Sequence, residues 1–294
     1  MTECPHGLNQ LDNASGAAGP FQGQVEIVHP VTVRAKIRHV VFDFDGTLSW
    51  LRHGWPRIMC ELFRSVFPVR TDESEKEVDE LLLDDILELS GKPTIFQVMR
   101  FCQCAADRGN SGLDPDLLLR EYQKRLLVEV ARRSCGIREG ITSPDEFMVY
   151  GARTFLCYLR EKGQAMSIVS ATSLQSVREE AALLKIDHFF GHRIYGSGAD
   201  GRHFSKIDVI SQILDAEKMD GDSLLSFGDG PVEIECCKEL GGLGIGVASE
   251  EERNGSGVMD PGKRLRLLKT GADIIVPDFR DAIPLFEHIV DGGK

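Results

Sequence analysis

Two aspartates separated by one phenylalanine end the first strongly apolar run of this 294-residue chain. The segment HVVFDFDGT supplies Asp43 and Asp45, which Gly46 and Thr47 follow directly. Carboxylates this close repel each other, so a cation or a shared proton must relieve the repulsion. Mg²⁺ is suited to such a site, because it takes oxygen ligands from one or two carboxylates together with a substrate phosphate. The alternative is an Asp-Gly turn beside a solvated carboxylate, which is a common local structure.

Three further groups of polar residues accompany predicted strands later in the chain. Ser170 ends the run IVS, where a hydroxyl and free backbone N–H groups can bind phosphate, although such residues also cap helices, as expected for Ser173. Lys206 is the first residue of a predicted helix, where a positive charge opposes the helix macrodipole and therefore suggests a functional role. The alternative is an ordinary exposed lysine. In SFGDGPVEIE, Asp229 is positioned to bind a cation, and Glu233 is positioned to support that site from the outer shell. The alternative is an ordinary turn followed by a helix that begins near Glu233. Each group alone is ordinary, whereas all of them in this order indicate one site.

The elements that must position these residues are predicted from periodicity. From about residue 149, helical and strand-like patterns alternate, which implies right-handed crossovers and a parallel, doubly wound sheet. The strand before Asp43 belongs to the same sheet, so the helical patterns between residues 55 and 133 form an insertion. In such sheets, ligands bind beyond the carboxyl ends of the strands. The alternating segment QVEIVHPV predicts an additional edge strand.

The same pattern predicts the domain organisation. Residues 1–23 form a flexible tail, residues 24–54 and 146–294 an α/β core, and residues 55–145 an all-helical cap. Residues 249–265 are expected to be a mobile, charged loop with solvated side chains.

Composition excludes several partners. The net charge of −12 and the isoelectric point near 5.2 argue against nucleic acid and against an anionic membrane surface. The eight cysteines include no CxxC pair, which favours reduced thiols in the cytosol. No signal peptide and no apolar run long enough to span a bilayer is visible, so we expect a cytoplasmic protein. The oligomeric state stays undetermined.

A family resemblance rests on Asp43, Asp45, Gly46, Thr47, Ser170, Lys206, Gly228, Asp229 and Glu233. In this order the residues resemble the haloacid dehalogenase (HAD) superfamily of phosphatases. Within it they are similar to the helical-cap (C1) subclass, which includes phosphoglycolate phosphatases and β-phosphoglucomutases. The resemblance extends from about residue 37 to the end of the chain. It implies a Rossmannoid core whose helical cap is inserted after the first strand.

The resemblance also implies catalytic roles. Asp43 would attack phosphorus and form an aspartyl-phosphate. Asp45 would protonate the leaving oxygen and later deprotonate the hydrolytic water. Ser170 and Lys206 would hold the transferring phosphoryl group. A dehalogenase attacks carbon and does not need the second aspartate, so Asp45 favours phosphoryl chemistry.

The implied cofactor is Mg²⁺. Asp43, the backbone carbonyl of Asp45, and Asp229 would hold the ion, and Glu233 would support it.

Substrate-binding residues implied by the resemblance are Gly46, Thr47, Ala171 and Lys92. Lys92 lies in the predicted cap segment LSGKPTIFQ, where a solvated lysine in a turn is the alternative. Arg52 and His53, on the way into the cap, could reach the site or lie on the surface.

The function expected from these residues is that of a Mg²⁺-dependent phosphatase acting on a small phosphorylated metabolite, for instance a sugar phosphate. One alternative is a phosphomutase of the β-phosphoglucomutase type, and another is a non-catalytic HAD-like binding protein. The chain has Ser49-Trp50-Leu51 where many capped relatives have an acidic residue and a Ser or Thr. The substrates of those relatives therefore cannot be assigned directly to this chain.

Overall fold

A computed structural model describes residues 21, 23–198 and 204–292 of the chain. Its described strands are β1 (Glu26–Ile27), β2 (His39–Phe42), β3 (Ala165–Ser173), β4 (Ile194–Ser197), β5 (Leu224–Gly228), β6 (Leu243–Val247) and β7 (Ile274–Val276). They form one seven-stranded sheet in the order β1-β7-β6-β5-β2-β3-β4. All neighbours are parallel except β1 and β7, so β1 is the edge strand that the segment QVEIVHPV predicts.

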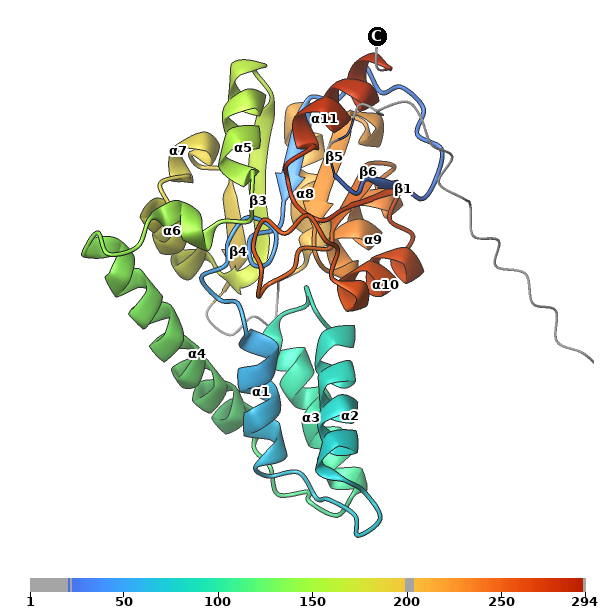
Figure 1. Cartoon of the computed structure of the whole chain (residues 1–294). Helices are drawn as coiled ribbons and strands as arrows, with labels where there is room; N and C mark the ends of the chain where they lie inside the picture. Colours follow the sequence, from blue (N-terminus) through green and yellow to red (C-terminus); the bar gives the residue numbers. More distant parts are fainter. Residues whose placement is uncertain (1–20, 22, 199–203, 293–294) are drawn as a thin grey trace, which may run out of the picture.

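Helices cover both faces of the sheet (Figure 1). They are α5 (Ala152–Glu161), α6 (Leu174–Leu183), α7 (Asp187–Phe190), α8 (Lys206–Glu217), α9 (Pro231–Glu239), α10 (Pro261–Thr270) and α11 (Ala282–Asp291). Side chains of β2 alternate between the faces, because successive strand residues point in opposite directions. Phe42 packs in the cluster that contains α5 and α11 residues, whereas Val41 packs with residues of α8 and α9. The predicted α/β doubly wound fold is confirmed.

Four further helices lie together beyond the carboxyl ends of the strands (Figure 1). They are α1 (Trp55–Arg64), α2 (Glu75–Glu88), α3 (Thr94–Asp107) and α4 (Pro115–Arg138). Their apolar side chains form a cluster between Met59 and Val130 that contains no residue of the sheet. Asp114 caps α4, since its side chain accepts hydrogen bonds from the backbone N–H groups of Asp116 and Leu117.

The separate apolar cluster supports the domain division that the sequence predicts. We propose that residues 55–145 act as a cap on a core formed by residues 24–54 and 146–294. A short 3₁₀ helix, Pro144–Phe147, leads from α4 back to the core, and a second one, Gly221–Ser223, precedes β5.

The predicted flexible tail lies almost entirely outside the described residues. Its two described members contact the core: Phe21 packs against the main apolar cluster, and the Gly23 N–H donates a 2.6 Å hydrogen bond to Asp281. Within the described part of the chain, no helix is long and apolar enough to cross a membrane. The seven cysteines in that part are free thiols, including the buried Cys236 and Cys237.

The prediction of a solvated loop at residues 249–265 is wrong from Pro261 onward and at three buried residues, whereas residues 249–260 form no helix or strand. Helix α10 begins at Pro261, and the Asp260 side chain caps it by accepting a 2.7 Å hydrogen bond from the Lys263 N–H. Ser249, Met259 and Lys263 are buried. The Asp-Pro pair is the same helix-start signal as at Asp114, but the surrounding charges obscured it.

Candidate active site

Three neighbouring strands bring the predicted motifs to one edge of the sheet. Phe42 of β2 pairs with Ile168 of β3 on one side and with Phe227 of β5 on the other. The residues that follow at the carboxyl ends therefore meet at nearly the same level. This register places the two aspartates after β2 next to the serine of β3 and the aspartate after β5.

Asp43 is paired with the lysine that opens α8. The Lys206 ammonium lies 2.7 Å from Oδ1 of Asp43 and also contacts the Glu233 carboxylate. Burial raises the pKa of the Asp43 carboxyl, whereas Lys206 opposes that shift. Burial would lower the pKa of Lys206, but the carboxylates of Asp43 and Glu233 outweigh it and raise the pKa. Lys206 is therefore held as a cation beside the proposed nucleophile.

Asp45 has a different set of partners. The Thr172 hydroxyl donates a 2.7 Å hydrogen bond to Oδ2 of Asp45, and the Arg52 guanidinium lies 3.7 Å from Oδ1. Arg52 also binds Glu180, with Nε 3.1 Å from Oε1. Burial raises the pKa of Asp45, while Arg52 and Thr172 counteract the shift. A carboxyl group with a raised pKa can serve as a general acid.

Ser170 lies inside β3 rather than at its end. Its side chain is 2% exposed, and its Oγ accepts a 3.1 Å hydrogen bond from the Thr172 N–H. The pairing of β3 with β4 is irregular between Ser170 and Ser173, so the strand bends where it passes the site. Ser173 caps α6 as expected, because its hydroxyl accepts from the Ser176 N–H.

Asp229 packs against the turn that follows the two aspartates. Gly46 has a φ of +77°, and a Cβ there would overlap the Asp229 carboxylate. Only glycine therefore satisfies both the backbone conformation and the close approach. The same carboxylate is paired with Lys263 of α10, whose Nζ is 2.9 Å from Oδ2. Thr47 is fully buried, and its hydroxyl has no hydrogen-bond partner in the described structure.

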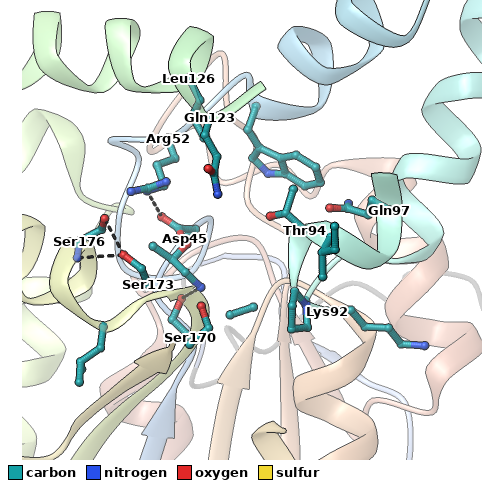
Figure 2. A pocket seen from close by; sticks show the side chains of 18 of the residues that line it. Asp45, Arg52, Lys92, Thr94, Gln97, Gln123, Leu126, Ser170, Ser173 and Ser176 are labelled. Atoms are coloured by element: carbon teal, nitrogen blue, oxygen red, sulfur yellow. Dashed lines mark hydrogen bonds and ion pairs between the residues drawn. The ribbon is translucent and has the colours of Figure 1, made fainter. Parts of the chain in front are cut away.

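A cavity of about 780 Å³ opens between these residues and the helical segment. Asp43, Asp45, Ser170, Ala171, Lys206 and Asp229 line it from the core. Trp55, Thr94, Gln97, Gln123 and Leu126 are among the residues that line it from α1, α3 and α4, and Figure 2 shows several of them facing Asp45.

Lys92 also lines this cavity, from the loop between α2 and α3, but its side chain is exposed. In Figure 2 the side chain points away from Asp45 and Ser170. Its role in substrate binding stays a prediction. Gly91 of the same loop comes close to Glu233, since a Cβ at Gly91 would lie 3.0 Å from Oε1. The loop therefore lies against the predicted catalytic edge.

The donors for a metal ion are present but are paired with lysines. Within the described residues, no group of three or more His, Cys, Asp or Glu side chains is arranged to hold a metal. Lys206 bridges Asp43 and Glu233, and Lys263 binds Asp229. Two buried carboxylate oxygens nevertheless accept no hydrogen bond within the described structure, Oδ1 of Asp45 and Oε2 of Glu233. Hard carboxylate oxygens with free valences are what Mg²⁺ prefers, so the residues present fit this ion.

Comparison with known families settles the class of protein. Residues 37–241 match the haloacid dehalogenase-like hydrolase family. The chain belongs to the haloacid dehalogenase-like hydrolases. The family and the hydrolase class predicted from the sequence are therefore confirmed. A comparison with curated proteins gave no match.

Solved structures share the fold at low identity. A predicted phosphoglycolate phosphatase from Haemophilus somnus is 15% identical, with a TM-score of 0.58 over 85% of this chain and 98% of its own. A predicted phosphatase from Clostridium acetobutylicum is 16% identical, with a TM-score of 0.56 over 84% and 96%. A β-phosphoglucomutase from Clostridium difficile is 13% identical, with a TM-score of 0.54 over 87% and 98%. At this identity the similarity establishes the fold alone.

Sequence reasoning missed several residues of this HAD-like site. Thr172 is two positions after Ser170, and no sequence pattern marks its hydroxyl as a partner of Asp45. Lys263 lies in the segment expected to be a solvated loop, yet it is buried, and Glu180 of α6 is buried as well. For Arg52 the sequence leaves a surface position and a position in the site both open, and the structure places it beside Asp45.

Proposed function

We propose that this HAD-like hydrolase is a phosphatase that hydrolyses a small phosphorylated metabolite through an aspartyl-phosphate on Asp43. The observation that carries the proposal is the pairing of Asp43 with Lys206 at 2.7 Å, in a cavity that Asp45 and Ser170 also line. A nucleophilic carboxylate, a fixed cation and a second carboxyl group are the parts that this chemistry needs. Phosphoryl transfer depends mainly on positioning and charge stabilisation.

The first step forms a bond between an Asp43 carboxylate oxygen and phosphorus and breaks the bond to the leaving oxygen. Lys206 offsets the negative charge of Asp43 and of the transferring group. Ser170 presents its hydroxyl to the phosphoryl oxygens from β3. Asp45, whose pKa burial raises, donates its proton to the leaving oxygen.

The second step returns the enzyme to its starting state. Asp45, now ionised, accepts a proton from the water that attacks the phosphorus of the aspartyl-phosphate. Thr172 and Arg52 stabilise Asp45 in this ionised form, because one donates a hydrogen bond to it and the other is a nearby cation. Inorganic phosphate is released and Asp43 is free again.

The proposed cofactor is Mg²⁺, bound by Asp43, the backbone carbonyl of Asp45, and Asp229, with Glu233 in support. When bound, it would supply positive charge against the phosphoryl oxygens. Gly46 contributes by letting the Asp229 carboxylate approach the turn after Asp45. In this structure the Asp43 carboxylate is paired with Lys206, and the Asp229 carboxylate is paired with Lys263.

The proposed substrate is a phosphorylated metabolite that fits between the core and the cap. The part of the cavity formed by α1, α3 and α4 carries both apolar and amide side chains, such as Trp55, Leu126, Gln97 and Gln123. A leaving group with polar and apolar surface, for instance a sugar, is compatible with this lining.

The test is phosphate release from p-nitrophenyl phosphate and from a panel of phosphorylated metabolites, with and without MgCl₂. The matched variant is Asp43→Asn, which keeps the volume of the side chain but removes the nucleophile. Release that requires MgCl₂ and vanishes in Asp43→Asn supports the proposal. Equal release by both proteins would contradict it, and conversion of a sugar phosphate into its isomer without net phosphate release would favour a phosphomutase.

A further inference from the structure

A second buried lysine lies beside the catalytic edge, and the mechanism above gives it no role. Lys263 is in the first turn of α10 and is 7% exposed. A cation in the first turn opposes the helix dipole, and burial of an ammonium group costs several kcal/mol unless it is paired. The position is therefore unfavourable for a lysine unless its contacts offset both costs.

The contacts of Lys263 converge on Asp229. Its Nζ lies 2.9 Å from Oδ2 of Asp229, 3.3 Å from the Ser249 hydroxyl and 3.7 Å from Oε1 of Glu251. The ammonium group also lies over the Trp50 ring, 4.9 Å from its centroid.

Lys263 binds one carboxylate oxygen of Asp229, Oδ2, and leaves the other oxygen, Oδ1, without a contact to Lys263. Among the described residues, no hydrogen bond or ion pair reaches Oδ1 of Asp229. The carboxylate is further confined by Gly46, where even a methyl group would overlap it. A carboxylate held through one oxygen presents the second in a fixed direction, which is how outer partners orient metal ligands.

Lys263 is itself held from the loop that follows β6. The Ser249 hydroxyl donates a 2.8 Å hydrogen bond to the Gly46 carbonyl, which ties this loop to the turn after Asp45. Oε2 of Glu251 accepts a 2.9 Å hydrogen bond from the Gly54 N–H, immediately before α1. The ammonium group is thus fixed from the core and from the entry into the cap.

We propose that Lys263 is a positioning residue for Asp229: it binds Oδ2 so that Oδ1 is available to a divalent cation. The inference rests on the proposed function, in which Asp229 is a metal ligand. The opposing possibility is that Lys263 merely fills the cation's place and competes with it. The two possibilities predict opposite changes in cation affinity when Lys263 is removed. Loss of a positioning residue weakens cation binding, whereas loss of a competitor strengthens it.

The experiment titrates the intact protein with MgCl₂ and follows binding by calorimetry, without substrate. For Lys263→Met we expect Mg²⁺ affinity to fall by about tenfold, within the range typical for partners that orient metal ligands. Lys238→Met is the matched control, because Lys238 forms a 2.5 Å ion pair with Asp273. It should bind Mg²⁺ as the wild type does.

A kinetic readout separates positioning from general damage. In Lys263→Met the MgCl₂ concentration for half-maximal p-nitrophenyl phosphate hydrolysis should rise about tenfold. At saturating MgCl₂, kcat and KM should return to within about threefold of the wild type, since the ion itself then orders Asp229. A disrupted fold would not be rescued in this way.

Glu251→Gln is the variant to measure if Lys263→Met does not fold, because Glu251 is partly exposed and supports Lys263 from one side. About a threefold loss of Mg²⁺ affinity is expected, as the outer partner is weakened rather than removed. Unchanged or tighter Mg²⁺ binding in the folded variants, with Asp229→Asn strongly impaired, would overturn this inference alone. No Mg²⁺ binding by the wild type, or normal binding by Asp229→Asn, would overturn the proposed metal site as well.

Discussion

Thr172 donates its hydroxyl hydrogen bond to Oδ2 of Asp45 over 2.7 Å, and its backbone N–H binds the Ser170 hydroxyl over 3.1 Å. One residue of β3 thereby connects the proposed acid/base to the proposed phosphate-binding serine. The hydroxyl stabilises the ionised form of Asp45, so it lowers a pKa that burial raises. Thr172 is therefore expected to set the pH range in which Asp45 can donate its proton.

Thr172→Val, which keeps the shape but removes the hydroxyl, should raise the pKa of Asp45 further. Asp45 must be protonated to donate to the leaving oxygen, and a higher pKa keeps it protonated to higher pH. The basic limb of the pH profile of kcat/KM should therefore move upward for a substrate with a poor leaving group. A shift toward lower pH would contradict the assignment, and Asp45→Asn should lack this limb altogether.

Gly46→Ala should abolish most of the activity. A Cβ at Gly46 would overlap the Asp229 carboxylate, and the φ of +77° adds strain of about 1 kcal/mol. Activity with p-nitrophenyl phosphate should fall at least about a hundredfold, since misplacement by about an ångström has effects of that size.

Gly163→Ala is the control for Gly46→Ala, because its φ is +71° and nothing lies within 4 Å of the added Cβ. The control should lose a similar amount of backbone stability and keep its activity. Equal activity in the two variants would show that the close approach of Asp229 to Gly46 has no functional role.

Removal of Arg52 should destabilise the protein. Burial raises the pKa of Glu180 to about 7, and Arg52 opposes this shift through a paired contact. Arg52→Met leaves a buried carboxylate without its partner, for which we expect a loss of about 3–5 kcal/mol in the free energy of unfolding. The double variant Arg52→Met/Glu180→Leu should recover at least half of that loss in urea denaturation. Simple additivity of the two single variants would contradict the proposed coupling.

His39 should make stability depend on pH in the acidic range. Burial lowers its pKa from 6.5 to about 4, so between these values the unfolded chain binds a proton that the folded protein does not. Stability is then lost as the pH falls from 6.5 to 4, by about 3 kcal/mol for this residue. His39→Gln should reduce the loss measured by urea denaturation at the two pH values. Identical pH dependence in both proteins would contradict the expectation.

The sheet and the order of its helices were predictable because apolar periodicity is local. Asp114 and Ser173 could be assigned as helix caps from their neighbours alone, and both cap helices in the structure. Strand ends in a parallel sheet share one edge, so the common location of Asp43, Ser170 and Asp229 followed from topology.

The partners of these residues were not predictable in the same way, since each depends on contacts between distant segments. Thr172 and Asp45 are 127 positions apart, and Arg52 and Glu180 are 128 positions apart. Lys263 lay in a segment whose charges suggested solvent, although the preceding Asp260-Pro261 pair carried a readable helix-start signal. The ammonium group of Lys263 is buried because it pairs with Asp229, and this contact between distant segments is known only from the folded structure.

The most direct test of the account is the chemical identity of the phosphorylated group. In Asp45→Asn, p-nitrophenyl phosphate still supplies a good leaving group, but the hydrolytic water loses its base. We expect a burst of one p-nitrophenol per enzyme, followed by slow turnover, and a base-labile phosphate on the peptide that contains Asp43 after acid quenching. Absence of the burst, or a phosphate on any other residue, would contradict nucleophilic catalysis by Asp43.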